Sequence, residues 1–215
     1  MEATDTMPLP TSSIPLRRGG YHPSFAAATT VVGPLPVFCS AKNEARLASA
    51  STLQHLLFQF LETEPAVQAF EPLANGAVEV RYWCGRIFAA PLPAEGRAKA
   101  AAIALKLAYT RLGRRLILVP ERRLTRRPGR DNRRIIAECG HATLRPAERT
   151  IVIDALLERG GSAELGDIAR LLPFSADPLA AILSLVSKGI LAVGMDRPVD
   201  DRSVISLFDP FAFAR

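Results

Sequence analysis

Two stretches in the first half of the chain repeat their apolar residues at helical spacing. The sequence STLQHLLFQFL at residues 51–61 places its large apolar side chains on one broad face, which predicts a core-facing helix ended by Pro65. Residues 97–112, RAKAAAIALKLAYTRL, have a high alanine content and therefore a high helix propensity. Gly113 follows at the position of a C-terminal stop, so a second helix is expected there.

Strand patterns lie on both sides of the second helix. Val78, Val80 and Tyr82 alternate with polar residues between turn signals, which predicts one strand of a hairpin whose other strand is residues 86–90. Residues 115–120, RLILVP, form a short continuous apolar run that is typical of a strand buried on both faces. A helix followed directly by such a strand favours an α/β layer.

Residues at two other places interrupt the regular patterns. Residues 1–36 are rich in Pro, Ser, Thr and Ala and show no sustained period, so we expect an extended arm. Residues 125–132, TRRPGRDN, contain no apolar side chain and predict a loop. A helix over residues 131–139 is expected to follow it.

The last third of the chain predicts three helices and two short strands. The helices are expected over residues 146–159, 164–172 and 178–188, and the strands in ILAVGM and SVISLF. Asp177 before Pro178 is a good N-cap, and Gly189 is a good C-terminal stop. Three helices with a two-stranded wing are the order of a winged helix.

The third of these helices, PLAAILSLVSK, offers few groups for reading DNA bases. Its one basic residue is Lys188 at the far end, and Asp177 places a negative charge where a phosphate would approach. Ser184 and Ser187 are weak candidates for base contacts. The composition favours a structural or partner-binding use of this helix over direct base reading.

The positive charge of the chain is concentrated in one segment. Residues 111–134 contain ten arginines, no lysine and two acidic residues, a net charge of +8, whereas the whole chain carries +6. Such focusing is expected of a phosphate-binding surface, and the planar guanidinium suits bidentate contacts with phosphate. A solvated basic face is the alternative interpretation. The predicted phosphate-binding residues are Arg114, Arg115, Arg122, Arg123, Arg126, Arg127, Arg130, Arg133 and Arg134.

Other features narrow the class of protein. The sequence has no run of about 18 apolar residues and no basic-then-apolar leader, so we expect a cytoplasmic, nucleoid-associated protein without membrane contact. Cys39, Cys84 and Cys139 are too widely spaced for a Cys-x-x-Cys metal site or a disulfide framework. Neither a metal site nor a cofactor is predicted from these residues.

The order of elements and several local strings resemble the TnsA-type endonuclease subunit of heteromeric transposases, over about residues 17–208. The strings are YHPS at 21–24, SAKNEAR at 40–46, SASTLQHLLFQFLETEPAVQAFEP at 49–72, AYTRLGRRLILVPERRL at 108–124 and RGGSAELGDIARLL at 159–172. The resemblance implies a restriction-endonuclease-like α/β domain, assigned to residues 37–140, and a C-terminal winged-helix domain, assigned to residues 141–215. It also implies DNA and other transposase or recombination proteins as partners.

The carboxylates that the family uses for cutting DNA are missing at the matching positions. Hydrolysis by this fold needs acidic residues that hold a divalent cation of the Mg²⁺ class, with a lysine nearby. The family's helix glutamates fall on Ala50 and Gln54, and its Pro-Asp element falls on a segment that includes Pro91. The lysine strand should lie within residues 91–100, which have no strand pattern and offer only Glu95 and Lys99. The resemblance therefore implies a degraded nuclease domain without catalytic residues.

Three hypotheses follow. The favoured one is a non-catalytic, TnsA-like, DNA-associated protein that uses its arginine segment on phosphates and its winged helix on partner proteins. The alternative is an active, Mg²⁺-dependent DNA endonuclease whose acidic ligands have migrated. The acids available to it are Glu62, Glu64, Glu71, Glu79 and Glu95. The third is an interaction scaffold whose arginines bind an acidic partner instead of DNA.

Overall fold

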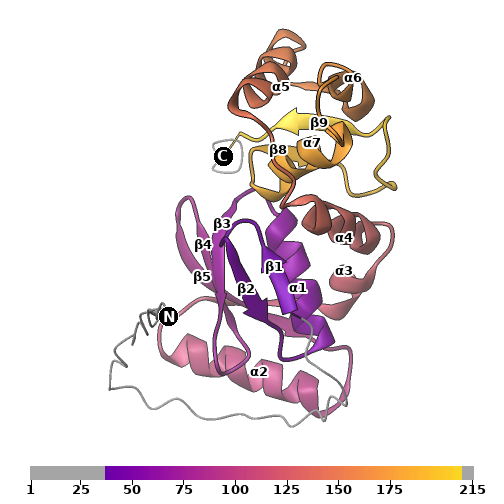
Figure 1. Ribbon diagram of the computed structural model, residues 1–215. Helices are drawn as coiled ribbons and strands as arrows, with labels where there is room; N and C mark the ends of the chain where they lie inside the picture. Colours follow the sequence, from indigo (N-terminus) through magenta and orange to yellow (C-terminus); the bar gives the residue numbers. More distant parts are fainter. Residues whose placement is uncertain (1–36, 210–215) are drawn as a thin grey trace, which may run out of the picture.

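The computed structural model describes residues 37–209, so the expected arm at residues 1–36 lies outside the described residues. The chain first forms a small hairpin and then a four-stranded sheet with helices around it (Figure 1). The elements of this part are β1 (Val37–Ser40), β2 (Ala45–Ala48), α1 (Thr52–Thr63), β3 (Val67–Pro72), β4 (Val78–Tyr82), β5 (Gly85–Leu92), α2 (Gly96–Arg111), β6 (Leu116–Pro120), α3 (Glu121–Thr125) and α4 (Gly129–Cys139). The two helices and the hairpin predicted from periodicity are confirmed.

The four-stranded sheet has the order β3-β4-β5-β6. Its first three strands form an antiparallel meander, and β6 pairs in parallel with β5 after the crossover through α2. Adjacent residues of β5 point to opposite faces, since Ala89 packs into the core with Leu57 and Phe58 of α1, whereas Ala90 packs with Tyr109 of α2. The two helices therefore cover opposite faces of the sheet, and the expectation of a mixed α/β fold is confirmed.

Two predictions for this part were wrong in detail. β6 is an edge strand, so only Leu116 and Val119 are well buried while Ile117 is 38% exposed, in contrast to the strand buried on both faces that we expected. The predicted loop at residues 125–132 is shorter, because α3 occupies residues up to Thr125 and α4 already begins at Gly129. The α4 backbone N–H of Asn132 bonds to the carbonyl oxygen of Pro128, which extends the helical turn toward the proline.

The rest of the chain forms a second layered unit. Its elements are α5 (Pro146–Glu158), β7 (Ser162–Glu164), α6 (Leu165–Ala169), α7 (Pro178–Ser187), β8 (Leu191–Val193) and β9 (Val204–Leu207). The three helices and the last two strands are present as predicted, but α6 covers only five of the nine residues expected for it. Asp177 caps α7 by accepting a hydrogen bond from the Ala180 N–H at 2.9 Å. The expected two-stranded sheet has three strands, in the order β7-β9-β8, because β7 pairs with β9.

Helix α7 is the centre of this second unit. Seven of its ten residues, 181–187, are buried, and it packs against α4, α6 and α1. Ser184 and Ser187 are both completely buried. The Ser184 hydroxyl donates to the Ala181 carbonyl oxygen, and the Ser187 hydroxyl donates to the carboxylate of Glu62. The two serines are therefore used in the interior, which agrees with the structural use expected for this helix.

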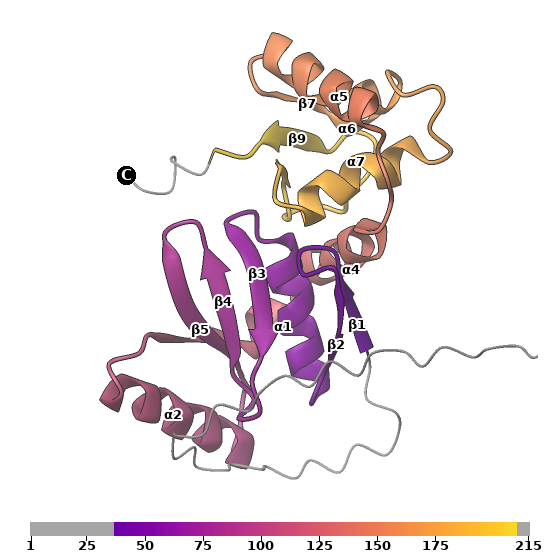
Figure 2. The same ribbon diagram turned by 60° about the vertical axis from the view of Figure 1, so that its left-hand side comes forward.

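Helix α4 joins the two halves of the molecule (Figures 1 and 2). Its residue Ala137 belongs to the core that contains α1, whereas Ile136 belongs to the core that contains α7. Close approach is possible because glycine stands at two contact points. A side chain at Gly140 would place its Cβ 2.7 Å from the Ser187 Oγ, and one at Gly189 would place it 2.8 Å from the Pro65 carbonyl oxygen.

The buried carboxylate of Glu62 lies at the same junction. It has no exposed surface and accepts four hydrogen bonds: from the Ser40 hydroxyl at 2.7 Å, the Ala41 N–H at 2.7 Å, the Lys42 N–H at 3.2 Å and the Ser187 hydroxyl at 2.8 Å. Donors from both halves of the chain thus converge on one anion. A buried charge is tolerated only when hydrogen bonds replace the lost water, and here they come from the β1–β2 turn and from α7.

Lys42 stabilises the end of the same helix from the opposite side. Its ammonium donates to the carbonyl oxygens of Leu61 at 3.1 Å and Glu64 at 2.5 Å, at the C-terminal end of α1 where carbonyl groups lack the regular helical bonds. Burial lowers the pKa of Lys42 to about 8, an effect that the charges of Glu62 and Glu64 oppose. Across residues 37–209, the structure contains no helix that is both long enough and apolar enough to span a membrane.

The junction predicts a specific response to loss of charge. Replacing Glu62 with Gln puts an amide donor among four donors, so the free energy of unfolding should fall by about 3 kcal/mol. Ser187→Ala removes one of the four bonds and should cost about 1 kcal/mol. Urea denaturation checks both values, provided that the dependence of the unfolding free energy on urea is unchanged. Equal stability of Glu62→Gln and the original chain would show that the charge is not needed.

Candidate functional site

The arginine segment folds around one buried leucine. Leu124 is 1% exposed and packs into the core beside α1, and this fixes the orientation of the short helix α3. Its neighbours Arg122 and Arg123 are consequently exposed. Arg126 and Arg127 follow in the turn to α4 and are exposed as well. One buried leucine with a pair of arginines on each side of it therefore brings four cations to the surface where α3 turns into α4.

These side chains border a pocket of 960 Å³, which we call the arginine groove. One wall belongs to α3, the following turn and the start of α4, and the other wall is formed by Met195 and Asp196 in the loop after β8. Five arginines line it, namely Arg122, Arg123, Arg126, Arg127 and Arg133. Polyanions are attracted strongly to a concave surface with this density of one charge sign.

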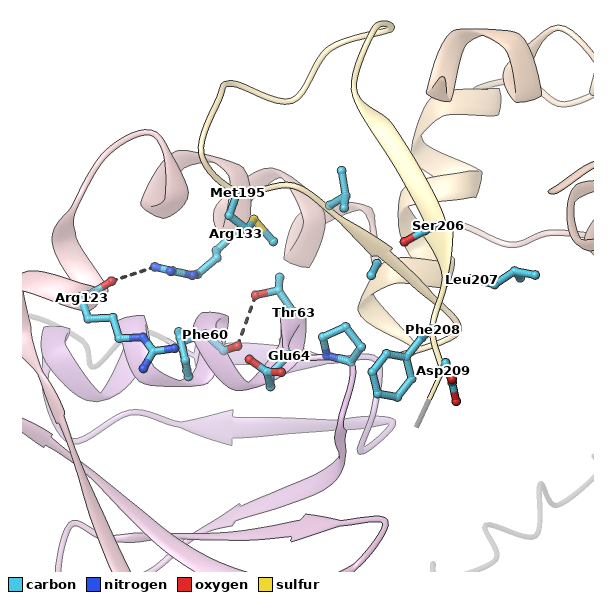
Figure 3. Close-up of a pocket in the computed structure, with 13 residues that line it drawn as sticks. Phe60, Thr63, Glu64, Arg123, Arg133, Met195, Ser206, Leu207, Phe208 and Asp209 are labelled. Carbon is cyan, nitrogen blue, oxygen red and sulfur yellow. Dashed lines mark hydrogen bonds between the residues drawn. The ribbon is translucent and has the colours of Figure 1, made fainter. Parts of the chain in front are cut away.

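An aromatic ring supports two of the guanidinium groups. The guanidinium carbons of Arg123 and Arg133 each lie 5.0 Å from the centre of the Phe60 ring, and Arg133 Nη1 donates to the Arg123 carbonyl oxygen at 3.1 Å (Figure 3). Each contact is a cation–π interaction that restricts the motion of a flexible side chain. Partial burial lowers the pKa of Arg133, and the neighbouring charge of Arg123 lowers it further, whereas Glu64 opposes both. Arg133 is therefore a partly buried cation whose side chain is already positioned.

The groove keeps most of its charge unpaired within the described part of the chain. Arg127 Nε forms an ion pair with the Asp131 carboxylate at 3.2 Å. Residues 37–209 provide no carboxylate within ion-pair distance of the other four arginines, although Asp196 lines the opposite wall. An anion that enters the groove can therefore bind four of these guanidinium groups without displacing a carboxylate of the described residues.

The remaining predicted arginines lie elsewhere. Arg114 and Arg115 precede β6, at the end of the strand opposite to α3, and border a separate pocket of 590 Å³ with Lys106 and Thr110. The strand between the two groups has five residues, so they are roughly 16 Å apart. Arg130 and Arg134 are exposed on α4 outside the groove. The nine predicted arginines therefore do not share one site, because five line the groove, two lie at the opposite end of β6 and two lie on the exposed surface of α4.

The positions that match the lost family residues have structural uses. Gln54 is 3% exposed, and its Oε1 accepts the Ala50 N–H at 2.6 Å, while the Gln54 N–H donates to the hydroxyl of the N-cap Ser51. Together these residues begin α1. Pro91 lies near the end of β5, opposite Val119 of β6. A separate lysine strand does not exist within residues 91–100, because β5 ends at Leu92 and α2 starts at Gly96.

The candidate acids of the endonuclease hypothesis are dispersed. Glu62 is the interior anion described above, Glu64 ends α1, and Glu95 is the residue before α2. Glu71 and Glu79 are paired across β3 and β4, and Glu79 forms an ion pair with Arg86 at 3.1 Å. Within residues 37–209, no group of three His, Cys, Asp or Glu residues is arranged to hold a metal ion.

Comparison with known proteins adds no relative. A scan of protein-family models and a search of curated proteins both find no match for this chain. The site must therefore be interpreted from its own geometry.

Sequence reasoning identified the arginines of the groove but not their surroundings. Phe60 was expected as a core residue of the first helix, and nothing marked it as a support for two cations. Met195 and Asp196 lie more than sixty residues after the arginines, in a segment expected to be a wing. Phe60 stands in a run of otherwise buried residues, 56–63, so no local pattern marked it as lying at the edge of the helix.

Asp131 offers a test that increases binding. Replacing it with Asn frees the Arg127 guanidinium and removes a negative charge beside the groove, so a polyanion should bind about two- to fivefold more tightly at low salt. Fluorescence anisotropy with labelled heparin measures the change. The matched control is Asp167→Asn, which frees Arg170 from an equivalent ion pair far from the groove and should leave affinity unchanged. Equal gains in both variants would contradict a specific site.

Proposed function

We propose that the chain is a non-catalytic, DNA-associated protein of the TnsA type, which binds DNA phosphates through the arginine groove and works with other transposition or recombination proteins. The observation that carries this proposal is the set of five arginines on one groove, four of them without an ion pair to the described residues. Bidentate guanidinium groups match phosphate oxygens, and such contacts give affinity without reading sequence.

Pre-positioning favours phosphate binding over a merely solvated basic face. The guanidinium groups of Arg123 and Arg133 both contact the Phe60 ring, and that of Arg133 is also held by its hydrogen bond to the Arg123 backbone carbonyl. Side chains that are already restricted lose less conformational entropy when they bind a phosphate. A surface that served solubility alone would not need two arginines stacked on one ring.

The arrangement of elements supports the family part of the proposal. A helix, a three-stranded antiparallel meander, a crossover helix and a parallel fourth strand are compatible with a restriction-endonuclease-like domain. Three helices with a small antiparallel sheet are compatible with a winged helix. In this interpretation α7 is a structural helix, since residues 181–187 are buried and cannot reach base edges. DNA contact then belongs to the groove and to the basic surface at Arg114 and Arg115.

The non-catalytic part of the proposal rests on where the carboxylates are. Ala50, Gln54 and Pro91 supply no carboxylate, and Glu62 is committed to four hydrogen bonds in the interior. Cutting a phosphodiester with the help of a cation requires several anionic oxygens on one ion. The dispersed acids of the described residues favour binding over hydrolysis.

DNA binding should depend on the groove and on salt. Changing Arg122, Arg123, Arg126 and Arg127 together to Ala should weaken binding to duplex DNA by about 10- to 100-fold near physiological salt, equally for unrelated sequences. The slope of log K against log salt concentration should become shallower by about three to four. Each phosphate contact that the variant lacks reduces the number of counterions released on binding by about one. Anisotropy titrations over a range of salt concentrations measure both quantities.

A matched control removes the same charge elsewhere. Arg81, Arg149, Arg159 and Arg202 are also exposed, and changing them together to Ala should leave the affinity within a few-fold of the original. Equal losses in the two quadruple variants would mean that only net charge matters. Complete absence of DNA binding at low salt would instead favour the interaction scaffold.

The endonuclease hypothesis is tested directly. Supercoiled plasmid incubated with the full chain and Mg²⁺ or Mn²⁺, alone and with a transposase partner, should remain supercoiled. Gel electrophoresis reports nicked and linear products. Nicking that one change, such as Glu71→Ala or Glu79→Ala, abolishes would overturn the proposal and assign these paired residues to the cation.

A further inference from the structure

Helix α2 has one face that none of the elements within residues 37–209 covers. It packs on β5 and β6 through Ala102 and Tyr109, which are its buried residues, and through Leu105. The opposite face carries large apolar side chains in solvent, since Ile103 is 44% exposed and Leu107 is 55% exposed. In both views of the molecule α2 lies at the end away from α5, α6 and α7 (Figures 1 and 2).

The exposed apolar residues form a straight seam. Ala100, Ile103 and Leu107 follow one another at spacings of three and four, the spacing that places side chains on one stripe of a helix. The spacing from Ala100 to Leu107 is one heptad, and with Ile103 between them they occupy the two core positions of a coiled-coil repeat. Ala100 and the adjacent Ala104 are small, so a second helix can approach the backbone closely.

Basic residues flank this seam on both sides. Lys99 and Lys106 are one heptad apart and immediately precede the two core residues Ala100 and Leu107, along one edge. Arg97 and Arg111 are two heptads apart and lie along the other edge. These are the flanking positions that select partners in coiled coils through charge. Helix α2 contains no acidic residue, so all four flanking charges are positive and have no partner within the helix.

We propose that α2 is a docking helix for a partner protein, and that the partner contributes an amphipathic helix with acidic residues along both edges of its apolar stripe. Charge complementarity decides the occupant. A second copy of this chain would place four cations against four cations across the seam, which opposes self-association. Two large apolar side chains without an aromatic residue also form a weak anchor for a lipid surface.

This inference deepens the proposed association with partner proteins but does not rest on DNA binding. The seam residues are absent from the arginine groove, so variants can separate the two activities. Lys106 borders the second basic surface beside Arg114 and Arg115, and for that reason the apolar seam is the cleaner target for mutation.

The experiment uses the full chain and two synthetic peptides of about three heptads, with Leu at the core positions and either Glu or Lys at all flanking positions. Fluorescence anisotropy at low salt should show the acidic peptide binding at least about tenfold more tightly than the basic one. The double variant Ile103→Ser, Leu107→Ser should lose about tenfold or more of that binding. The four-residue groove variant should retain it, which separates failure here from failure of the DNA proposal.

Charge reversal gives the sharpest result. Changing Arg97, Lys99, Lys106 and Arg111 together to Glu should reverse the preference, so that the basic peptide binds more tightly than the acidic one. Circular dichroism confirms that each variant is folded. The proposal is overturned if neither peptide binds, or if the acidic peptide binds equally well after the seam residues are changed. It is equally overturned if the same seam instead mediates dimerisation in sedimentation experiments or binding to phosphatidylcholine vesicles that contain phosphatidylglycerol.

Discussion

The arrangement of the molecule depends on one buried carboxylate. Glu62 brings the end of its own helix α1, the β1–β2 turn and the end of α7 to a single point, because its carboxylate needs donors in place of water and Ser40, the turn and α7 supply them. Glycine at positions 140 and 189 allows the backbones around it to approach. The second half of the chain is thereby seated on α1, and the loop after β8 faces α3 across the groove.

This arrangement makes the basic surface a groove with two walls and not a flat positive face. The groove has a wall from each half, and the loop that forms the second wall is held near α3 by the packing of α4 against α7 and by the hydrogen bonds of Asn132. Phe60 belongs to the same helix as Glu62 and supports two of the guanidinium groups. Helix α1 therefore has two roles. Glu62 contacts the second half of the chain, and Phe60 positions two of the arginines.

Local patterns in the sequence predicted the elements that are long or strongly periodic. The alternation of Val78 and Val80 and the helical spacing around Leu57 were sufficient, because those side chains define the core. Helix α3 and strand β7 were missed, since five and three residues are too few for a period to develop. The edge position of β6 depends on pairing with β5 across a sixteen-residue helix, which no local pattern contains. From the sequence, Glu62 was a candidate for a migrated metal ligand. Only its hydrogen bonds from Ser40 and Ser187 show that it is a buried structural residue.

The buried amide of Asn132 anchors the far wall of the groove to α4. This residue is 1% exposed, and its side chain donates to the Arg197 carbonyl oxygen at 2.7 Å and accepts the Val199 N–H at 3.0 Å. The loop that contains Met195 is thus fastened to α4, the helix that also carries Arg133. Because both walls of the groove are attached to α4, we expect the width of the groove to change little on binding and a flexible polyanion to adjust its own shape.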